Sequence, residues 1–178
     1  MTHLTRQEKS SIEQKVEQIK LDTGLAYPEN NLLEIASSLG VDVLSADLPD
    51  FQEKKVKGYI KWLPESERGN APYRARIYLN SNQSDTTKNF TLAHELGHFL
   101  LHKDESNFRI DLQDYSEEDA DNQETEANFF AGCLLMPKDK LIIALNNAKS
   151  FGEVARSFGV SIPAVKARIN WIPLKLAS

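Results

Sequence analysis

Cysteine is almost absent from this chain of 178 residues, whose one cysteine is Cys133. A single cysteine excludes an internal disulfide framework and the multi-cysteine sites that hold most structural zinc ions. We expect Cys133 to be a small buried apolar residue. Long apolar stretches are absent as well, since none approaches the roughly 18 residues that span a bilayer. The first twenty residues are polar and charged, without the apolar centre of a signal peptide, so we expect a cytoplasmic protein with no membrane partner.

The remaining composition is typical of one folded domain, or of a domain with a small appendage. Apolar residues make up 40% and charged residues 26%, as in most soluble globular proteins. The net charge of −5 is unevenly spread. Residues 138–178 have seven Lys and Arg against two acidic residues, whereas residues 103–126 have ten acidic against two basic ones. An acidic middle and a basic end can serve different partners.

Capping signals and apolar periodicity predict helices, then a small antiparallel sheet, then more helices, which is an α+β fold. A capping box at residues 5–8 and an N-cap at Asn31 would begin the first two helices. We expect strands at 41–44, 58–63 and 74–79, and residues 64–72 would join the last two as a hairpin. We expect further helices near 88–102, 123–135, 138–147, 151–158 and 162–170. Residues 85–87 are N-cap candidates for the helix near 88–102.

His94-Glu95-Leu96-Gly97-His98 places two histidines four residues apart on one predicted helix. Both imidazoles then project from one face of the helix and can reach one metal ion, with nitrogen–zinc distances of about 2.0–2.1 Å. Glu95 points to the side of that position, where it can accept and return a proton instead of binding the ion. The pattern indicates a catalytic Zn²⁺ site in which Glu95 is the acid/base.

The same spacing arises by chance in roughly one such chain in a hundred, because short motifs have many accidental matches. Here the helix is apolar on most sides, so both histidines would be buried, and buried imidazoles need partners. We therefore favour a metal site over a chance arrangement. The apolar residues of this helix are Phe90, Leu92, Ala93, Leu96, Phe99 and Leu100.

A third ligand is needed, because two histidines alone do not make a zinc site. His102 continues the four-residue series, but on a straight helix it lies about 12 Å along the axis from His94, too far for one ion. It would instead lie at the pocket edge, form a hydrogen bond there, or be an ordinary histidine at a helix end.

Glu124, on the predicted helix at 123–135, is the better candidate and completes a two-histidine, one-carboxylate site with an open fourth position. A solvated charge at a helix start is the alternative for Glu124. Glu126 lies some 200° around the helix from Glu124 and would face elsewhere. Asn128 lies one turn beyond Glu124 and could orient a ligand histidine through the other ring nitrogen.

Residues 90–102, with the paired motif at 124–131 and Leu134-Leu135-Met136-Pro137, resemble the ImmA/IrrE family of zinc metallopeptidases. The resemblance implies a thermolysin-like minimal zincin core, in which a small sheet packs on an active-site helix and a ligand helix. It also implies bacterial or phage-element proteins that cleave or inactivate a helix-turn-helix repressor. Carried over by position, His94, His98 and Glu124 would bind zinc and Glu95 would be the acid/base. Tyr115 is a candidate oxyanion donor or an ordinary loop tyrosine.

The basic end has helix-turn-helix spacing over residues 151–165, and its second helix carries Lys166, Arg168 and Asn170. Taken alone, these features suggest DNA binding. We favour a helical segment, 138–178, that packs on a metallopeptidase core, 1–137, and whose charge could dock an acidic protein substrate. Three hypotheses result: a peptidase acting on a repressor, a regulator that binds DNA or protein through the basic end, and a binding module without catalysis.

Overall fold

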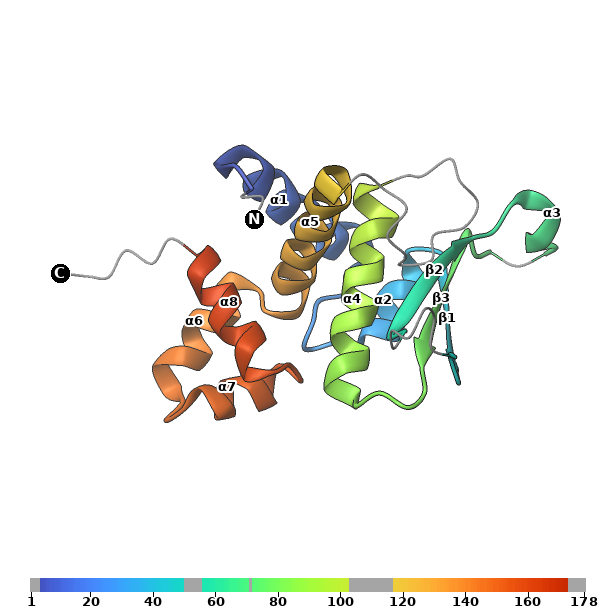
Figure 1. Cartoon of the computed structure of the whole chain (residues 1–178). Helices are drawn as coiled ribbons and strands as arrows, with labels where there is room; N and C mark the ends of the chain where they lie inside the picture. Colours follow the sequence, from blue (N-terminus) through green and yellow to red (C-terminus); the bar gives the residue numbers. More distant parts are fainter. Residues whose placement is uncertain (1–3, 50–55, 71, 103–116, 173–178) are drawn as a thin grey trace.

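The structure, a computed structural model, describes residues 4–49, 56–70, 72–102 and 117–172, with only the backbone described for 117–121 (Figure 1). The described elements confirm the predicted α+β class. The helices are α1 (Arg6–Thr23), α2 (Leu32–Ser38), α3 (Glu65–Arg68), α4 (Asp85–Leu101), α5 (Glu117–Leu135), α6 (Lys138–Asn147), α7 (Phe151–Ser157) and α8 (Ile162–Trp171), and the strands are β1 (Val41–Ala46), β2 (Gly58–Trp62) and β3 (Ala75–Asn80).

The sheet has the strand order β1-β3-β2 and is mixed, whereas we expected it to be antiparallel throughout. The predicted hairpin is present: β2 pairs antiparallel with β3, so that Ile60 lies opposite Ile77. β1 pairs with the other edge of β3 and runs parallel to it, with Val43 opposite Ile77. Apolar alternation predicts that a segment is a strand, but the direction of a strand is set by its neighbour in the sheet when no tight turn joins the two.

The first residues of the helices agree with the expected positions in some cases and differ in others. Thr5 and Glu8 form the expected capping box on α1. Helix α4 begins earlier than expected, because its N-cap is Ser84, whose hydroxyl accepts a hydrogen bond from the Thr87 backbone N–H at 3.2 Å. Helix α5 also begins earlier, at Glu117. The short α3 was not predicted and lies in the hairpin loop.

Helix α4 is the central layer of the molecule, with the sheet on one side and α5 on the other (Figure 1). Residues 91–98 of α4 are therefore all buried. The core on the sheet side includes Ile60 and Ile77, and the core on the α5 side includes Phe129 and Phe130, all fully buried. A helix covered on two sides keeps its polar side chains away from solvent, and such groups need partners within the protein.

The C-terminal helices pack on this core chiefly through α8 and α5. Gly132 permits the contact, since a Cβ there would lie 2.9 Å from Cζ3 of Trp171. Trp171 also packs against Phe129, with 5.2 Å between ring centroids. The Tyr27 hydroxyl donates a hydrogen bond of 2.6 Å to the carbonyl of Phe158, which links the chain after α1 to the end of α7. The division of the chain at residue 137 stays a prediction.

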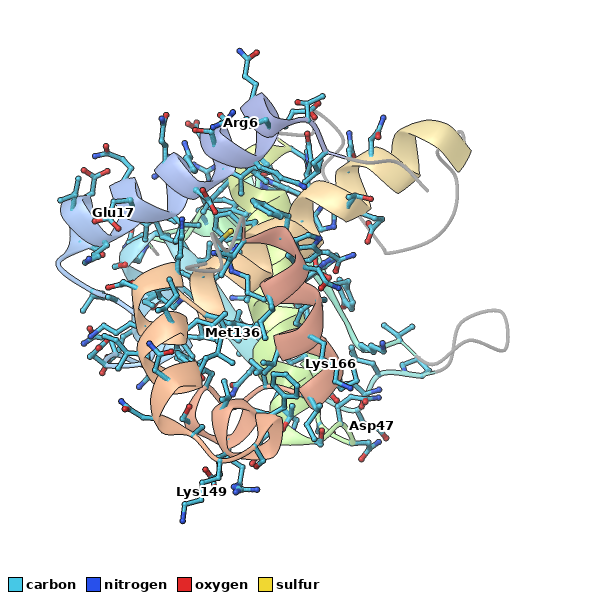
Figure 2. All side chains as sticks on the ribbon, turned by 90° about the vertical axis from the view of Figure 1, so that its left-hand side faces the viewer. Arg6, Glu17, Asp47, Met136, Lys149 and Lys166 are labelled. Atoms are coloured by element: carbon cyan, nitrogen blue, oxygen red, sulfur yellow. The ribbon has the colours of Figure 1, made fainter. Side chains whose placement is uncertain are left out.

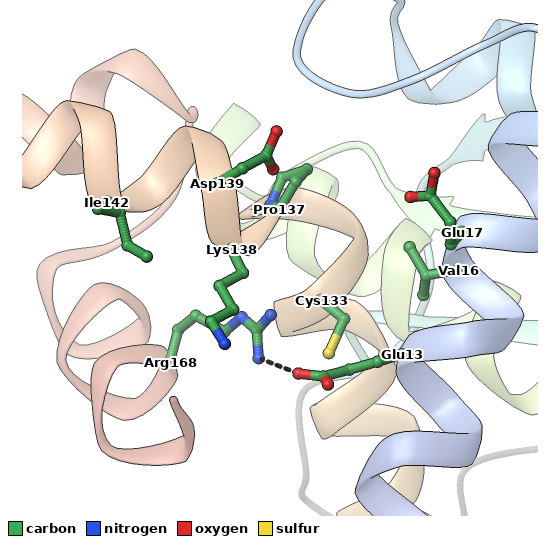
Figure 3. Close-up of a pocket in the computed structure, with 9 residues that line it drawn as sticks. All are labelled: Glu13, Val16, Glu17, Cys133, Pro137, Lys138, Asp139, Ile142 and Arg168. Carbon is green, nitrogen blue, oxygen red and sulfur yellow. Dashed lines mark ion pairs between the residues drawn. The ribbon is translucent and has the colours of Figure 1, made fainter. Parts of the chain in front are cut away.

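Arg168 is buried, with 2% of its surface exposed, in the region where α1, α5, α6 and α8 meet. Its Nε donates a 3.2 Å hydrogen bond to the carbonyl of Met136, and its Nη1 lies 3.7 Å from Oε1 of Glu13. Figure 3 shows this arginine reaching from α8 toward Glu13, beside Cys133. These three residues line a pocket of about 400 Å³. Within the described ranges, no helix has the length and apolar character of a membrane span.

The burial of Cys133 can be tested chemically. This residue is 3% exposed, as expected for a small core residue. Desolvation raises the pKa of its thiol to about 12, and alkylating reagents react with the thiolate. The folded protein should therefore resist iodoacetamide at about pH 8, near the ordinary thiol pKa, and react once guanidinium chloride unfolds it. Mass spectrometry of both samples measures this, and rapid alkylation of the folded protein would contradict the packing around α5.

Candidate metal centre

His94, His98 and Glu124 meet between α4 and α5. The Nε2 atoms of the two histidines lie 3.0 Å apart. Glu124 places Oε2 at 3.2 Å from Nε2 of His94 and Oε1 at 3.1 Å from Nε2 of His98. The structure thus brings together the three residues that the sequence predicted as ligands, and they form a group that could hold a metal ion.

The donor set fits Zn²⁺. Two imidazole nitrogens and one carboxylate are ligands that this ion accepts. Tetrahedral zinc with bonds of about 2.0–2.1 Å holds its ligand atoms roughly 3.3 Å apart. The observed separations of 3.0–3.2 Å between the facing nitrogen and oxygen atoms are close to that value. An ion could therefore enter with only small side-chain movements.

The centre is buried on the side of α4 and more open on the side of α5. His94 and His98 are 8% and 3% exposed, whereas the Glu124 side chain is 34% exposed. Burial raises the pKa of Glu124, but its hydrogen bonds with the two histidines outweigh this effect and hold the pKa well below its usual range. Glu124 is therefore a carboxylate at neutral pH, which is the form that binds a cation.

Gly97 explains why α5 can approach α4 so closely. A Cβ at this position would lie 3.1 Å from the Cα of Ala127 and 3.3 Å from the carbonyl oxygen of Ala127. Because no side chain separates the two backbones here, residues of α5 close to Ala127 also reach α4. Glu124 contacts His98 in this way, and Asn128 contacts His94.

Asn128 lies where its spacing from Glu124 predicted. Its Oδ1 is 3.1 Å from Nδ1 of His94, the ring nitrogen that faces away from Glu124. An amide oxygen can only accept a hydrogen bond, so this contact suits a histidine that carries its proton on Nδ1. The orienting role of Asn128 stays a prediction, and the geometry agrees with it.

His102 ends α4 as its C-cap, with φ −119° and ψ 78°. Its Nδ1 lies 3.0 Å from Nδ1 of His98, and its Nε2 lies 2.7 Å from Oε2 of Glu126. His102 therefore forms a hydrogen bond at the edge of the centre, one of the places that the sequence left open for it. Glu126 faces away from Glu124's partners, as predicted, but its contact with His102 was missed.

The missed contact has a physical cause. Helical geometry separates positions 124 and 126 by about 200°, and this reasoning cannot place a residue that has left the helix. His102 is such a residue, since its backbone is no longer helical. The signal available in the sequence was only a histidine at a predicted helix end. The predicted oxyanion donor, Tyr115, lies outside the described residues.

Comparison with known proteins identifies the family of the chain. Residues 36–170 match the family described as the IrrE N-terminal-like domain, a peptidase family. The chain belongs to this family. The matched range includes α4 and α5 and therefore the three clustered residues. The ImmA/IrrE resemblance inferred from the motifs is thus confirmed.

The chain is also similar to one protein in sequence and to another in fold. The chain is 31% identical over 147 residues to the radiation response metalloprotease IrrE of Deinococcus deserti, a match that covers 78% of this chain and 52% of that protein. The chain thus spans about half the length of this IrrE relative. A Mycobacterium tuberculosis transcriptional regulator has a similar fold, with a TM-score of 0.59 and 17% identity, over 93% of this chain and 48% of that one. At this identity the likeness concerns the fold alone.

The close approach at Gly97 can be tested by adding one methyl group. Gly97→Ala should push α5 away from α4, destabilise the protein by about 1–3 kcal/mol, as overpacking does, and weaken zinc binding because Glu124 moves with α5. Denaturant unfolding and a chelator competition measure the two effects. Gly152→Ala on α7 is the matched control, since its Cβ would have ordinary contacts of 3.6 Å or more. The control should be neutral or stabilising by up to about 1 kcal/mol, and equal effects of the two changes would contradict the packing described.

Proposed function

We propose that this chain is a zinc-dependent endopeptidase that cleaves a helix-turn-helix transcriptional repressor in the cytoplasm. The observation that carries the proposal is the convergence of His94, His98 and Glu124 in a chain of the IrrE N-terminal-like family. This donor set leaves a fourth position open, which is the arrangement of catalytic rather than structural zinc. Glu95 follows the first ligand on α4 and is 4% exposed, so the acid/base candidate lies in the same buried layer.

The residues of the chain have separate tasks in this reaction. When bound, the zinc ion polarises the scissile carbonyl and makes water more acidic. The two imidazoles and the carboxylate of Glu124 orient the ion. Glu95 accepts a proton from the attacking water and returns it to the nitrogen of the leaving amine. The more exposed side of Glu124 is where a peptide can approach the centre.

The sheet offers a way to align such a peptide. Among the described strands, β2 lies at an edge of the sheet, and it is packed against α4, the helix that carries both histidines. An extended peptide can add to a free strand edge by main-chain hydrogen bonds. A peptide on this edge would run beside the metal centre. We infer a repressor as the protein substrate from the resemblance to the ImmA/IrrE family.

DNA binding through the basic end is the alternative, and the structure gives it less support. Of the three polar residues on α8 that suggested it, Arg168 is buried and holds Met136 and Glu13. Lys166 is exposed, and Figure 2 shows it on the surface together with Lys149. The surface of α8 therefore has fewer cations than the sequence suggested. Because DNA binding depends on exposed cations that contact phosphates, this favours a segment that packs on the core over one that binds DNA. These exposed lysines could instead dock an acidic protein substrate.

Glu95→Gln separates catalysis from metal binding. We expect the variant to retain about one zinc ion per chain, because the ligands are unchanged, and to cleave at least about a hundredfold more slowly, as loss of a general acid/base does. The measurement is co-expression with a candidate helix-turn-helix repressor from the same genome, with both proteins followed by immunoblot and zinc by mass spectrometry. Repressor fragments should appear with the wild type alone.

Intact repressor with both the wild type and Glu95→Gln would contradict the proposal that this repressor is the substrate of a peptidase. Salt-dependent binding of duplex DNA that is equal in both forms, without cleavage, would favour the regulator. Capture of the repressor without cleavage, again equal in both forms, would favour the binding module.

Zinc should also stabilise the folded chain, since a ligand that binds only the folded state adds about 2.7 kcal/mol at a hundred times its dissociation constant. Thermal unfolding with and without zinc measures this, and a chelator should reverse the shift. Glu124→Gln should remove most of the effect because it removes the anionic ligand. Glu17→Gln is the control, a change on an exposed part of α1. An equal zinc shift in both variants would exclude Glu124 as a ligand.

A further inference from the structure

A histidine that binds zinc through Nε2 must offer a lone pair at that atom and carry its proton on Nδ1. In this centre both histidines turn Nε2 toward Glu124. The Nδ1 atoms point away from it, and their partners decide which tautomer each ring adopts. For His94 the partner is the amide oxygen of Asn128, which accepts. For His98 the partner is His102, and because a histidine nitrogen can donate or accept, this contact alone does not fix the tautomer of His98.

The ambiguity at His98 is resolved by Glu126. Nδ1 of His98 lies 3.0 Å from Nδ1 of His102, and in a neutral pair of rings either atom could be the donor. Nε2 of His102 lies 2.7 Å from Oε2 of Glu126, and a carboxylate can only accept. A neutral His102 therefore donates from Nε2, which leaves its Nδ1 with a lone pair. That lone pair accepts the hydrogen bond from Nδ1 of His98.

We propose that His102 and Glu126 are positioning residues, and that they form a hydrogen-bonded chain that holds His98 in the tautomer able to bind zinc. The inference rests on the proposed metallopeptidase function. His102 contacts the ring nitrogen of His98 that faces away from Glu124, and Glu126 contacts His102, so both residues act on the metal position through His98. Carboxylates commonly orient zinc-binding histidines directly, and here a second imidazole lies between them.

Burial protects these hydrogen bonds from competition by water. The side chains of His98 and His102 are 3% and 8% exposed, so bulk water does not readily replace either partner. Glu126 is 28% exposed and forms the outer end, where its charge remains partly solvated. The two carboxylates of α5 thus have different tasks: Glu124 faces the metal position, and Glu126 acts from the far side of His98. The same arrangement ties the end of α4 to the ligand helix.

The test uses two variants of the full chain. Glu126→Gln keeps the shape but permits the amide to donate or accept, so His102 and His98 can reverse their tautomers. His102→Phe keeps a ring of similar size but removes both nitrogens. We expect either change to lower zinc affinity by about 10–100-fold, as loss of such orienting partners does. A chelator competition with zinc measures the affinity, and Glu17→Gln on α1 is the matched glutamate control.

A second readout does not depend on cleavage. In the zinc-loaded protein, ¹⁵N NMR of the imidazole nitrogens should show His98 protonated at Nδ1 and His102 as a single Nε2–H tautomer, and Glu126→Gln should leave the tautomer of His102 mixed. The double variant should lose no more zinc affinity than His102→Phe alone, because the two residues act in series. Saturating zinc should restore most of the cleavage lost in Glu126→Gln and none of that lost in Glu95→Gln.

Unchanged zinc affinity in both variants, with an unchanged His102 tautomer in Glu126→Gln, would overturn the inference, even if the wild type cleaves the repressor. Conversely, a changed tautomer with weaker zinc binding would support it even if no repressor is cleaved, in which case only the proposed substrate fails. Circular dichroism of each variant shows that it is folded. Additive losses in the double variant would also count against a chain that acts in series.

Discussion

The close contact of α4 and α5 at Gly97 is the constraint on which the candidate metal centre depends. A Cβ there would come within 3.1 Å of the backbone of Ala127, so glycine is what lets the helices meet. Because a helix repeats about every 3.6 residues, one close contact brings the neighbouring turns together as well. Glu124, about one turn before Ala127, reaches His98, and Asn128, the residue after Ala127, reaches His94. The geometry of the site therefore follows from packing between two backbones.

Burial of the histidine pair imposes a second requirement, because each imidazole nitrogen in a covered layer needs a suitable partner. The nitrogens that face the metal position meet Glu124, and those that face away meet Asn128 and His102. Glu126 completes the set by contacting His102. A centre satisfied on its outer side has its inner nitrogens already directed to one point, so little rearrangement is needed when an ion binds. Such order before binding is what catalytic metal sites require.

The C-terminal helices show that charge in a sequence is not the same as charge on a surface. Seven Lys and Arg make residues 138–178 basic, yet Arg168 is buried against Met136 and faces Glu13. Its long side chain joins α8 to α1 across the end of α5, so this cation belongs to the packing of the basic segment on the rest of the chain. The cations left on the surface, such as Lys149 and Lys166, are the ones available to a partner (Figure 2).

The sequence by itself determined those features that depend on near neighbours. The four-residue spacing of His94 and His98, the capping box of α1 and the hairpin between β2 and β3 all follow from local geometry, and the combination of motifs was specific enough to indicate the family. Glu124 was predictable because the second motif supplies a carboxylate on another helix. Tertiary structure alone decided the parallel pairing of β1, the burial of Arg168 and the contact of His102 with Glu126. Each of these joins segments far apart in the chain, or involves a residue beyond a helix end, where periodicity no longer says which way a side chain points.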